Sequence, residues 1–208
     1  MKYDPEKHHR RSIRLKGYDY TQMGVYFITV VTKDRECLFG EVTDGETRLN
    51  DAGQAIERWW VELNRKFTMV ETDDFVVMPN HFHGIIAIAD VRVGADLRVG
   101  PASNRNGANG RAGAHIGAPL RASIPWIVQW FKTMTTNEYI RGVKQLGWTG
   151  FRGQLWQRNY YEHVIRTQES LDRIRQYIVE NPSKWECDPE NPTATIVEAN
   201  DPWKSDER

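Results

Sequence analysis

The sequence predicts an α+β fold in which helices cover an antiparallel sheet, and three observations support this class. Short runs rich in β-branched and aromatic residues predict strands, and segments with apolar residues at helical spacing predict helices. The two kinds of segment do not alternate in the regular βαβ pattern of a parallel sheet. With 208 residues, 39% of them hydrophobic, the chain is long enough for one domain with its own core.

The first strand and the first helix are predicted in the N-terminal third of the chain. Residues 24–33 (GVYFITVVTK) are rich in β-branched and aromatic side chains, which predicts a buried strand. Asn50 or Asp51 can cap a helix that runs to about Asn64, with apolar residues at helical spacing.

Two further strands are predicted in the middle of the chain, at residues 74–78 (DFVVM) and 81–89 (HFHGIIAIA). Pro79-Asn80 between them is a turn or bulge signal. Residues 91–120 then change character, with no aromatic residue and many Gly, Ala, Asn and Arg residues. Because such a segment cannot bury enough apolar surface to offset its ordering entropy, we expect a flexible insertion.

The second half of the chain predicts two helices and an aromatic stretch between them. Ser123, followed by Pro125 in the first turn, opens a helix with a wide apolar face. Residues 151–164 predict a strand or an extended connection. Thr167 caps a final helix, which Pro182 terminates.

Composition limits the class of protein. The apolar runs are too short to span a membrane, and the N-terminus has no apolar stretch of a secretory signal. Two cysteines, Cys37 and Cys187, cannot form a disulfide framework, so we expect a reducing cytoplasm. The net charge is zero, but basic residues crowd the N-terminus and the second half while acidic residues gather at the C-terminal end. A basic region of such a chain can still bind phosphates, because salt screens the electric field of distant acidic residues beyond roughly 8–10 Å.

Three parts are therefore expected along the chain. Residues 1–20 form a basic N-terminal arm, and residues 21–185 form one domain that carries the insertion at 91–120. Residues 186–208 form an acidic, polar tail with several prolines, which we expect to be loosely packed.

His81-Phe82-His83 is the sharpest chemical feature of the sequence. Alternate residues of a strand share a face, so the two imidazoles point the same way, onto an open sheet face, and Phe82 points into the core. Two imidazoles on one face form half of a metal site, whose third ligand must come from another element. The alternative is a pair of surface histidines on a half-exposed strand.

This triplet and two later motifs together resemble a known family. MPNHFHGIIAI, followed downstream by WQRNYYEHVIR and QYIVENPSKW, is similar to the single-tyrosine HUH transposases, in particular the branch of REP-associated tyrosine transposases. HUH denotes histidine, a hydrophobic residue and histidine. The resemblance runs from about Gly24 to Trp185, interrupted by residues 91–120.

The resemblance implies a ferredoxin-like or RNA-recognition-like sheet with both histidines on a central strand. It also implies a late-helix tyrosine that attacks single-stranded DNA, leaving a covalent 5′-phosphotyrosine and a 3′-hydroxyl, with Mg²⁺ or Mn²⁺ polarising the phosphate. The chemistry of the residues agrees, since a phenol with a pKa of about 10 is a weak nucleophile that needs a divalent ion beside an anionic phosphodiester. A covalent intermediate keeps the bond energy, which suits strand transfer.

The nucleophile and the third metal ligand are implied by the motif Y-I-x-x-N-P. Tyr177 matches the family's tyrosine, and Asn181, one helical turn later, matches the third ligand. Tyr177 could instead be a core aromatic residue, and Asn181 could simply end the helix before a proline. Tyr160 and Tyr161 are the other candidate tyrosines, better suited to packing or base stacking.

Further residues are candidates for supporting roles. Glu162 and His163 match the family's E-H pair and could orient a ligand or contact DNA. Arg10, Arg11 and Arg14 could anchor a short guide sequence beside a hairpin, or make looser phosphate contacts.

The sequence thus predicts a metal-dependent endonuclease and strand transferase for single-stranded or hairpin DNA, such as repeated palindromes in its own genome. It would act as a monomer or homodimer, without a membrane partner. One rival is a mobile-element transposase with the same chemistry, and another is a DNA-hairpin-binding protein without catalysis. A third, a hydrolase with an H-x-H metal centre, needs more carboxylate ligands than the sequence places near His81 and His83.

Overall fold

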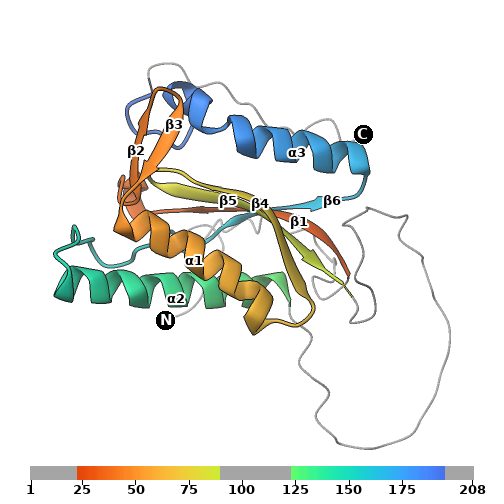
Figure 1. Cartoon of the computed structure of the whole chain (residues 1–208), viewed down its shortest axis with the longest axis horizontal. Coiled ribbons are helices and arrows are strands. Elements are labelled where there is room, and N and C mark those ends of the chain that lie inside the picture. Colours follow the sequence, from red (N-terminus) through yellow and green to blue (C-terminus); the bar gives the residue numbers. More distant parts are fainter. Residues whose placement is uncertain (1–22, 90–122, 195–208) are drawn as a thin grey trace, which may run out of the picture.

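A four-stranded antiparallel sheet forms the middle layer of the structure, a computed structural model that describes residues 23–89 and 123–194. The strand order is β4-β5-β1-β6. The sheet strands are β1 (Gly24–Val31), β4 (Val70–Val77), β5 (His81–Ile88) and β6 (Tyr161–Ile165). Helices α1 (Asp51–Lys66) and α2 (Ile124–Gln145) cover one face, and α3 (Gln168–Glu180) covers the other (Figure 1).

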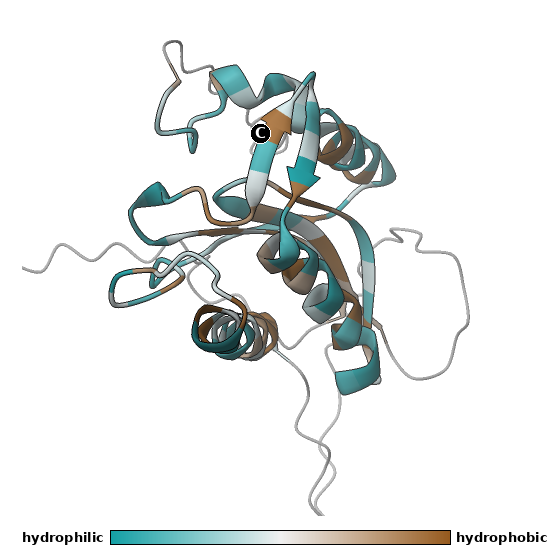
Figure 2. Ribbon diagram, turned by 60° about the vertical axis from the view of Figure 1, so that its left-hand side comes forward, coloured by the Kyte–Doolittle hydropathy of each residue, from teal (hydrophilic) through white to brown (hydrophobic). Residues whose placement is uncertain are grey.

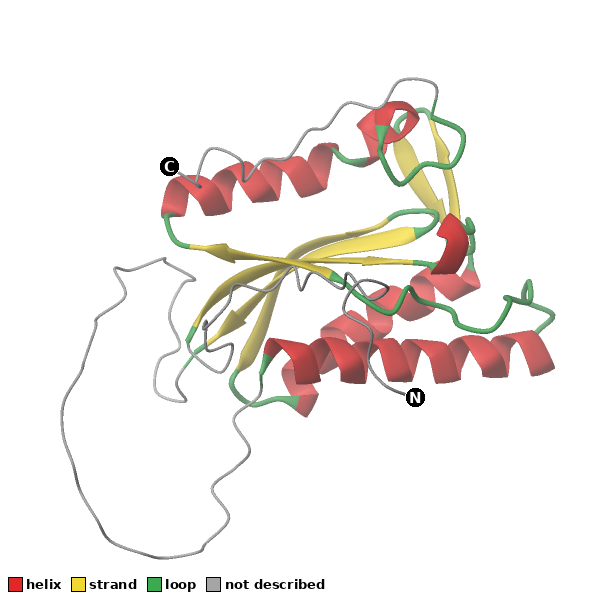
Figure 3. Ribbon diagram, turned by 180° about the vertical axis from the view of Figure 1, so that it is seen from behind, coloured by secondary structure: helices red, strands yellow, loops and turns green. Residues whose placement is uncertain are grey.

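The path of the chain through this sheet is the ferredoxin-like one. Two strand-helix-strand units interleave, so that β1 and β5 lie in the centre and β4 and β6 at the edges. Seen from behind, the same three layers appear, with α1 and α2 on one side of the sheet and α3 on the other (Figure 3). The predicted α+β class, an antiparallel sheet with helices packed on it, is confirmed.

Three sequence-based expectations lie outside the described residues. They are the basic arm with Arg10, Arg11 and Arg14, the insertion at 91–120, and the end of the acidic tail from residue 195. Within the two described ranges, no helix has the length and apolar character that crossing a bilayer requires.

The helix boundaries follow the local signals in the sequence. Asn50 caps α1, since its side chain accepts a hydrogen bond from the backbone N–H of Gly53 at 3.0 Å. Thr167 caps α3 in the same way, accepting from the N–H of Ser170 at 3.1 Å. Pro125 stands in the first turn of α2, where its missing N–H is not needed. The predicted starts of all three helices are therefore confirmed.

The strands differ from the prediction in extent. β4 begins at Val70, ahead of the predicted residues 74–78, and a bulge between Thr72 and Phe75 shifts its register against β5. The polar run before Phe75 concealed this half of the strand, because the bulge breaks the period-two pattern. The predicted strand or extended connection at 151–164 becomes regular only at β6.

A second, two-stranded sheet was missed by the sequence reading. It consists of β2 (Gly40–Thr43) and β3 (Glu46–Leu49). Asp44 and Gly45 make its turn, with φ of 56° and 76°. Asp-Gly is the strongest short hairpin signal, because both residues tolerate positive φ. The signal was present, but the flanking segments are too short and polar to predict as strands.

The sheet divides the core into two clusters. Phe82 belongs to the cluster under α1 and α2, where its ring centroid lies 4.5 Å from that of Trp60. Gly84 leaves room for this indole, since a Cβ there would lie 2.5 Å from a ring carbon of Trp60. The cluster under α3 contains Phe27 and Ile174. Hydrophobic residues accordingly gather along the central strands (Figure 2).

Candidate active site

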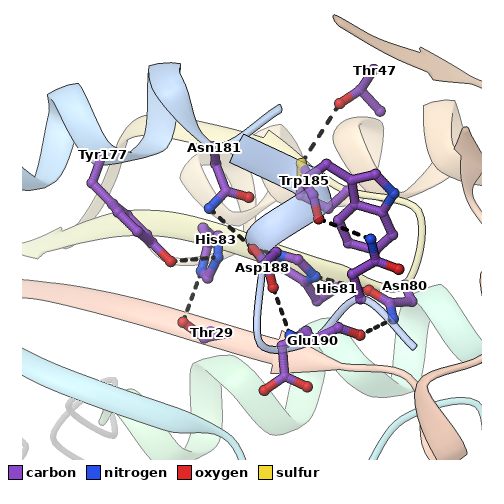
Figure 4. Close-up of polar contacts among 12 residues, drawn as sticks. Thr29, Thr47, Asn80, His81, His83, Tyr177, Asn181, Trp185, Asp188 and Glu190 are labelled. Atoms are coloured by element: carbon purple, nitrogen blue, oxygen red, sulfur yellow. Dashed lines mark hydrogen bonds and ion pairs between the residues drawn. The ribbon is translucent and has the colours of Figure 1, made fainter. Parts of the chain in front are cut away.

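His81 and His83 stand on the central strand β5 and face α3. In the pairing with β1, His81 lies opposite Val31 and His83 opposite Thr29, while Phe82 points into the other core cluster. The predicted alternation is confirmed. The expected open sheet face is wrong, since His81 is 0% and His83 4% exposed. The end of α3 and residues 181–191 close over both rings (Figure 4).

Each imidazole has one nitrogen bonded at the sheet and the other directed at a shared space. Nδ1 of His81 lies 2.9 Å from Oδ1 of Asn80, and Nδ1 of His83 lies 2.8 Å from Oγ1 of Thr29. The two ring centroids are 4.6 Å apart. The remaining nitrogens, both Nε2, therefore lie on the side from which α3 and the C-terminal segment approach (Figure 4).

Asp188 is the third member of this cluster. Its carboxylate and one nitrogen of each histidine all lie within 4.8 Å of one another. Its Oδ2 is 3.8 Å from Nε2 of His81, and its Oδ1 accepts a hydrogen bond from the backbone N–H of Glu190 at 2.6 Å. Asp188 follows the short helix η2 (Pro182–Cys187) and is buried.

The sequence reading missed Asp188 because it stands among the acids of a tail that we expected to be loosely packed. Residues 186–194 are instead part of the described structure, and Asp188 and Asn191 are buried there. Only the turn-forming Asp-Pro and Asn-Pro pairs at 188–189 and 191–192 hinted at an ordered segment.

Asn181 caps the C-terminus of α3 and points inward. It is 2% exposed, and its Nδ2 donates a long hydrogen bond of 3.5 Å to Oδ2 of Asp188. Its Oδ1 is buried and has no hydrogen-bond partner within the described residues. Figure 4 shows the amide directed at the same space as the histidines rather than at solvent.

Tyr177 lies one helical turn before Asn181, on the same side of α3. Its hydroxyl is 3.4 Å from Nε2 of His83, and its ring meets Phe27 edge-on at 6.0 Å. Of the other candidate tyrosines, Tyr161 packs against the core cluster under α3 and Tyr160 against the cluster on the opposite face. The structure thus places the Tyr177 phenol beside the histidine cluster.

The E-H pair is divided by the sheet. In the pairing with β1, Glu162 lies opposite Ile28 and His163 opposite Phe27, so they face opposite sides. His163 shares the α3 face with the histidine cluster, whereas Glu162 is buried on the α1 and α2 side. The structure therefore does not bring Glu162 to the histidines.

Burial favours the uncharged form of both imidazoles in the cluster. It lowers the pKa of His83 well below its usual value, and the neighbouring His81 lowers this pKa further. Burial also lowers the pKa of His81, although the carboxylates of Asp188 and Glu190 and the Asn181 side chain act in the opposite direction. Neutral imidazoles have a lone pair to offer to a metal ion.

The buried polar atoms fit a divalent cation. Nε2 of His81 and Oδ1 of Asn181 are both buried without a hydrogen-bond partner within the described residues, and Nε2 lies 3.8 Å from the buried carboxylate of Asp188. Buried polar atoms are nearly always paired, so unpaired acceptors need a further partner. The His81–His83–Asp188 cluster could therefore bind a metal ion, and the Asn181 amide lies next to it, with Nδ2 at 3.5 Å from Oδ2 of Asp188.

Comparisons with known proteins identify the fold and a relative of the chain. No protein-family model matches the sequence. An uncharacterized protein of Haemophilus influenzae is 38% identical over 192 residues, covering 90% of this chain and 96% of that protein. A solved REP-associated tyrosine transposase, bound to a REP hairpin, covers 83% of this chain and 74% of its own with 19% identity and a TM-score of 0.50. The chain thus belongs to one family with the Haemophilus influenzae protein, and its fold is that of the HUH tyrosine transposases.

Proposed function

We propose that this chain is a metal-dependent single-stranded DNA endonuclease and strand transferase that acts on hairpin or palindromic DNA. The observation that carries the proposal is the 3.4 Å distance between the Tyr177 hydroxyl and Nε2 of His83. A phenol beside a buried His-His-Asp cluster combines a nucleophile with a metal site. The hairpin bound to the solved transposase of the same fold supports the DNA substrate.

Mg²⁺ or Mn²⁺ is the proposed cofactor. His81, His83 and Asp188 would hold it, and the Asn181 amide oxygen would complete the set. Bound there, the ion offsets the negative charge of the scissile phosphate and orients it for in-line displacement. Imidazole ligands suit transition metals and oxygen ligands suit hard ions, so this mixed set favours Mn²⁺ over Mg²⁺.

Tyr177 is the proposed nucleophile. Its Oη forms a bond to phosphorus while the bond between phosphorus and O3′ breaks. The electron pair of the broken bond leaves with O3′, which takes up one proton, and the phenol loses one. The 5′-phosphate stays on Tyr177, so attack by another 3′-hydroxyl can rejoin strands without an external energy source.

Helix α3 would place the nucleophile and a metal ligand together, since it carries both Tyr177 and Asn181. An ion pair attaches this helix to the sheet: Nε of Arg175 donates to Oδ2 of Asp73 at 3.0 Å. Asp73 lies in the bulge of β4, which turns its carboxylate towards α3. One rigid element therefore fixes the geometry that nucleophilic attack requires.

The presence of Asp188 beside the two histidines also favours testing a second function, that of a metal-dependent hydrolase. A hydrolase with an H-x-H metal centre lacked carboxylate ligands in the sequence, and Asp188 supplies one. In such an enzyme water would attack the phosphate, and Tyr177 would not become attached to DNA. The two enzymes differ in their products. The strand transferase leaves the 5′-phosphate of the cut covalently attached to Tyr177, whereas the hydrolase leaves both DNA ends free.

Strand-labelled hairpin oligonucleotides with single-stranded flanks distinguish these possibilities. With Mn²⁺, a strand transferase transfers a 3′-end label onto the protein and releases a 5′-labelled fragment that a polymerase can extend. A hydrolase releases both labels as free fragments. A protein that only binds hairpins shifts the oligonucleotide in a native gel and leaves both labels on intact DNA.

A further inference from the structure

Asn80 is the residue of the β4–β5 turn whose side chain reaches the histidine cluster. It follows Pro79, precedes His81 and is 0% exposed. Its backbone carbonyl accepts a hydrogen bond from the N–H of Thr32 at 2.8 Å, at the end of β1. This hydrogen bond fixes the main chain of Asn80. The orientation of its side-chain amide then depends on the hydrogen bonds that the amide makes.

The Asn80 amide has both of its N–H groups engaged. Nδ2 donates to the backbone carbonyl of Arg35 at 3.0 Å and to that of Glu190 at 2.7 Å. A primary amide has only two such donors. Turning the amide over would place Oδ1 against two carbonyl oxygens and lose both hydrogen bonds, so the network sets the orientation.

This orientation decides which nitrogen of His81 carries the proton. Oδ1 of Asn80 can only accept, and it lies 2.9 Å from Nδ1 of His81. Nδ1 must therefore be the N–H, which leaves a lone pair on Nε2 of the neutral ring. Free neutral histidine in water favours the opposite tautomer, so the protein has to impose this one.

The imposed tautomer has a consequence at Asp188. With no proton on Nε2 of His81, this nitrogen and Oδ2 of Asp188 face each other at 3.8 Å as two electron-pair donors. Such a pair repels unless a cation lies between the two atoms. The same tautomer is the one that a metal ion bound at Nε2 requires.

Asn80 also holds the turn that carries Asp188. Its hydrogen bond to the carbonyl of Glu190 fixes the residue whose own N–H donates to Oδ1 of Asp188 at 2.6 Å. One amide thus contacts a proposed ligand directly and supports a second one through a single intervening residue.

We infer that Asn80 is a positioning residue of the metal site, which fixes His81 with its proton on Nδ1 and anchors the turn that presents Asp188. This inference rests on the proposed function in one respect, namely that the positioned residues bind a metal ion. The tautomer itself follows from hydrogen bonds of the metal-free chain, so it can be tested without metal or DNA.

Nitrogen NMR of ¹⁵N-histidine-labelled, metal-free protein at about pH 7.5 provides the direct test, because protonated and unprotonated ring nitrogens differ widely in chemical shift. The His81 signals are assigned by their loss in His81→Gln. We expect wild-type His81 to carry its proton on Nδ1, and Asn80→Ala to move it largely to Nε2. A proton on Nε2 in the wild type would overturn the inference, whether or not the variant folds.

Asn191→Ala is the matched control for the turn. Asn191 holds the same segment, since its Nδ2 donates to the carbonyl of Trp185 at 2.9 Å, but its side-chain hydrogen bonds join Trp185 and Thr193 and not His81. This variant should keep the proton on Nδ1 of His81. If it shifts the tautomer as Asn80→Ala does, general loosening of the segment is responsible and the inference fails.

Titration with Mn²⁺ links the tautomer to the metal site. Loss of a residue that orients a ligand typically weakens metal binding by roughly 10–100-fold, which is the effect expected for Asn80→Ala. An unchanged Mn²⁺ affinity in Asn80→Ala would overturn the positioning role. A wild type that shows the Nδ1 proton but binds no Mn²⁺ would defeat the proposed metal chemistry and leave the tautomer assignment standing.

Discussion

The carboxylate of Asp188 lies 3.8 Å from Nε2 of His81, although the two residues stand far apart in the sequence. Asp188 reaches this position because η2 turns the chain back beneath the C-terminus of α3. The candidate metal site is therefore completed by a segment that follows the last regular helix. Its candidate ligands come from β5 and from the turn after η2, and the further proposed ligand Asn181 stands at the end of α3.

Asp188→Ala should weaken Mn²⁺ binding by at least about tenfold, because it removes the one carboxylate of the cluster. Isothermal titration calorimetry on metal-free protein measures this change. Glu186→Gln is the matched control, since Glu186 is an exposed acid of the same segment. Equal losses in the two variants would mean that general charge, and not ligation by Asp188, attracts the ion.

Asn181→Ala should raise the half-saturating Mn²⁺ concentration, because a buried amide oxygen without a hydrogen-bond partner within the described residues is lost. Asn181→Asp keeps an oxygen donor at this position and should restore much of the affinity. DNA cleavage measured against Mn²⁺ concentration gives both values. If the two substitutions raise it equally, Asn181 serves only to end α3.

The metal-free protein should lose stability as the pH falls below about 6.5, the ordinary pKa of an unfolded histidine. Burial lowers the folded-state pKa of both His81 and His83, so the unfolded chain binds more protons in this range. The free energy of unfolding then decreases with falling pH, by at most about 1.4 kcal/mol per pH unit for each histidine.

Urea denaturation at several pH values in the presence of a chelator measures this slope. His83→Gln removes one of the two groups and should flatten the dependence between pH 6.5 and 5.5. A stability that rises as the pH falls would show that the histidines are protonated in the folded chain, which would contradict the neutral metal-ligating pair.

Phe82→Ala should cost roughly 3–5 kcal/mol of stability, because a fully buried aromatic ring is removed from the cluster with Trp60 and Phe131. Phe82→Leu refills most of the space and should cost clearly less. Chemical denaturation compares the two. A small loss in Phe82→Ala would contradict the burial of the central residue of the histidine triplet.

The fold was predictable to the extent that signals were local. Caps at Asn50 and Thr167 set helix starts, and the alternation at His81-Phe82-His83 placed one ring in the core and two imidazoles together. The prediction of an open sheet face around those imidazoles was wrong. The alternation along a strand tells which face of the sheet a side chain is on, but it does not tell which other segments cover that face.

The candidate site was predictable only where its residues stand in motifs. His81, His83, Tyr177 and Asn181 were named from the sequence, and the structure brings them together. Asp188 was not named as a site residue, and Asn80, although it stands within the quoted motif, was named only as a turn signal. Their contacts are with distant segments: Asp188 with His81, and Asn80 with the carbonyls of Arg35 and Glu190. Contacts between distant segments produce no periodic pattern or fixed residue spacing that could be recognised in the sequence.

The central claim is that Tyr177 is the nucleophile, and covalent capture of 3′-labelled hairpin DNA by tyrosine variants tests it most directly. With Mn²⁺, wild type, Tyr160→Phe and Tyr161→Phe should all carry the label through a denaturing gel. Tyr177→Phe should lose it while binding the hairpin within a few-fold of wild type, because only the attacking oxygen is removed. A labelled adduct that persists in Tyr177→Phe and disappears in Tyr160→Phe or Tyr161→Phe would contradict the account.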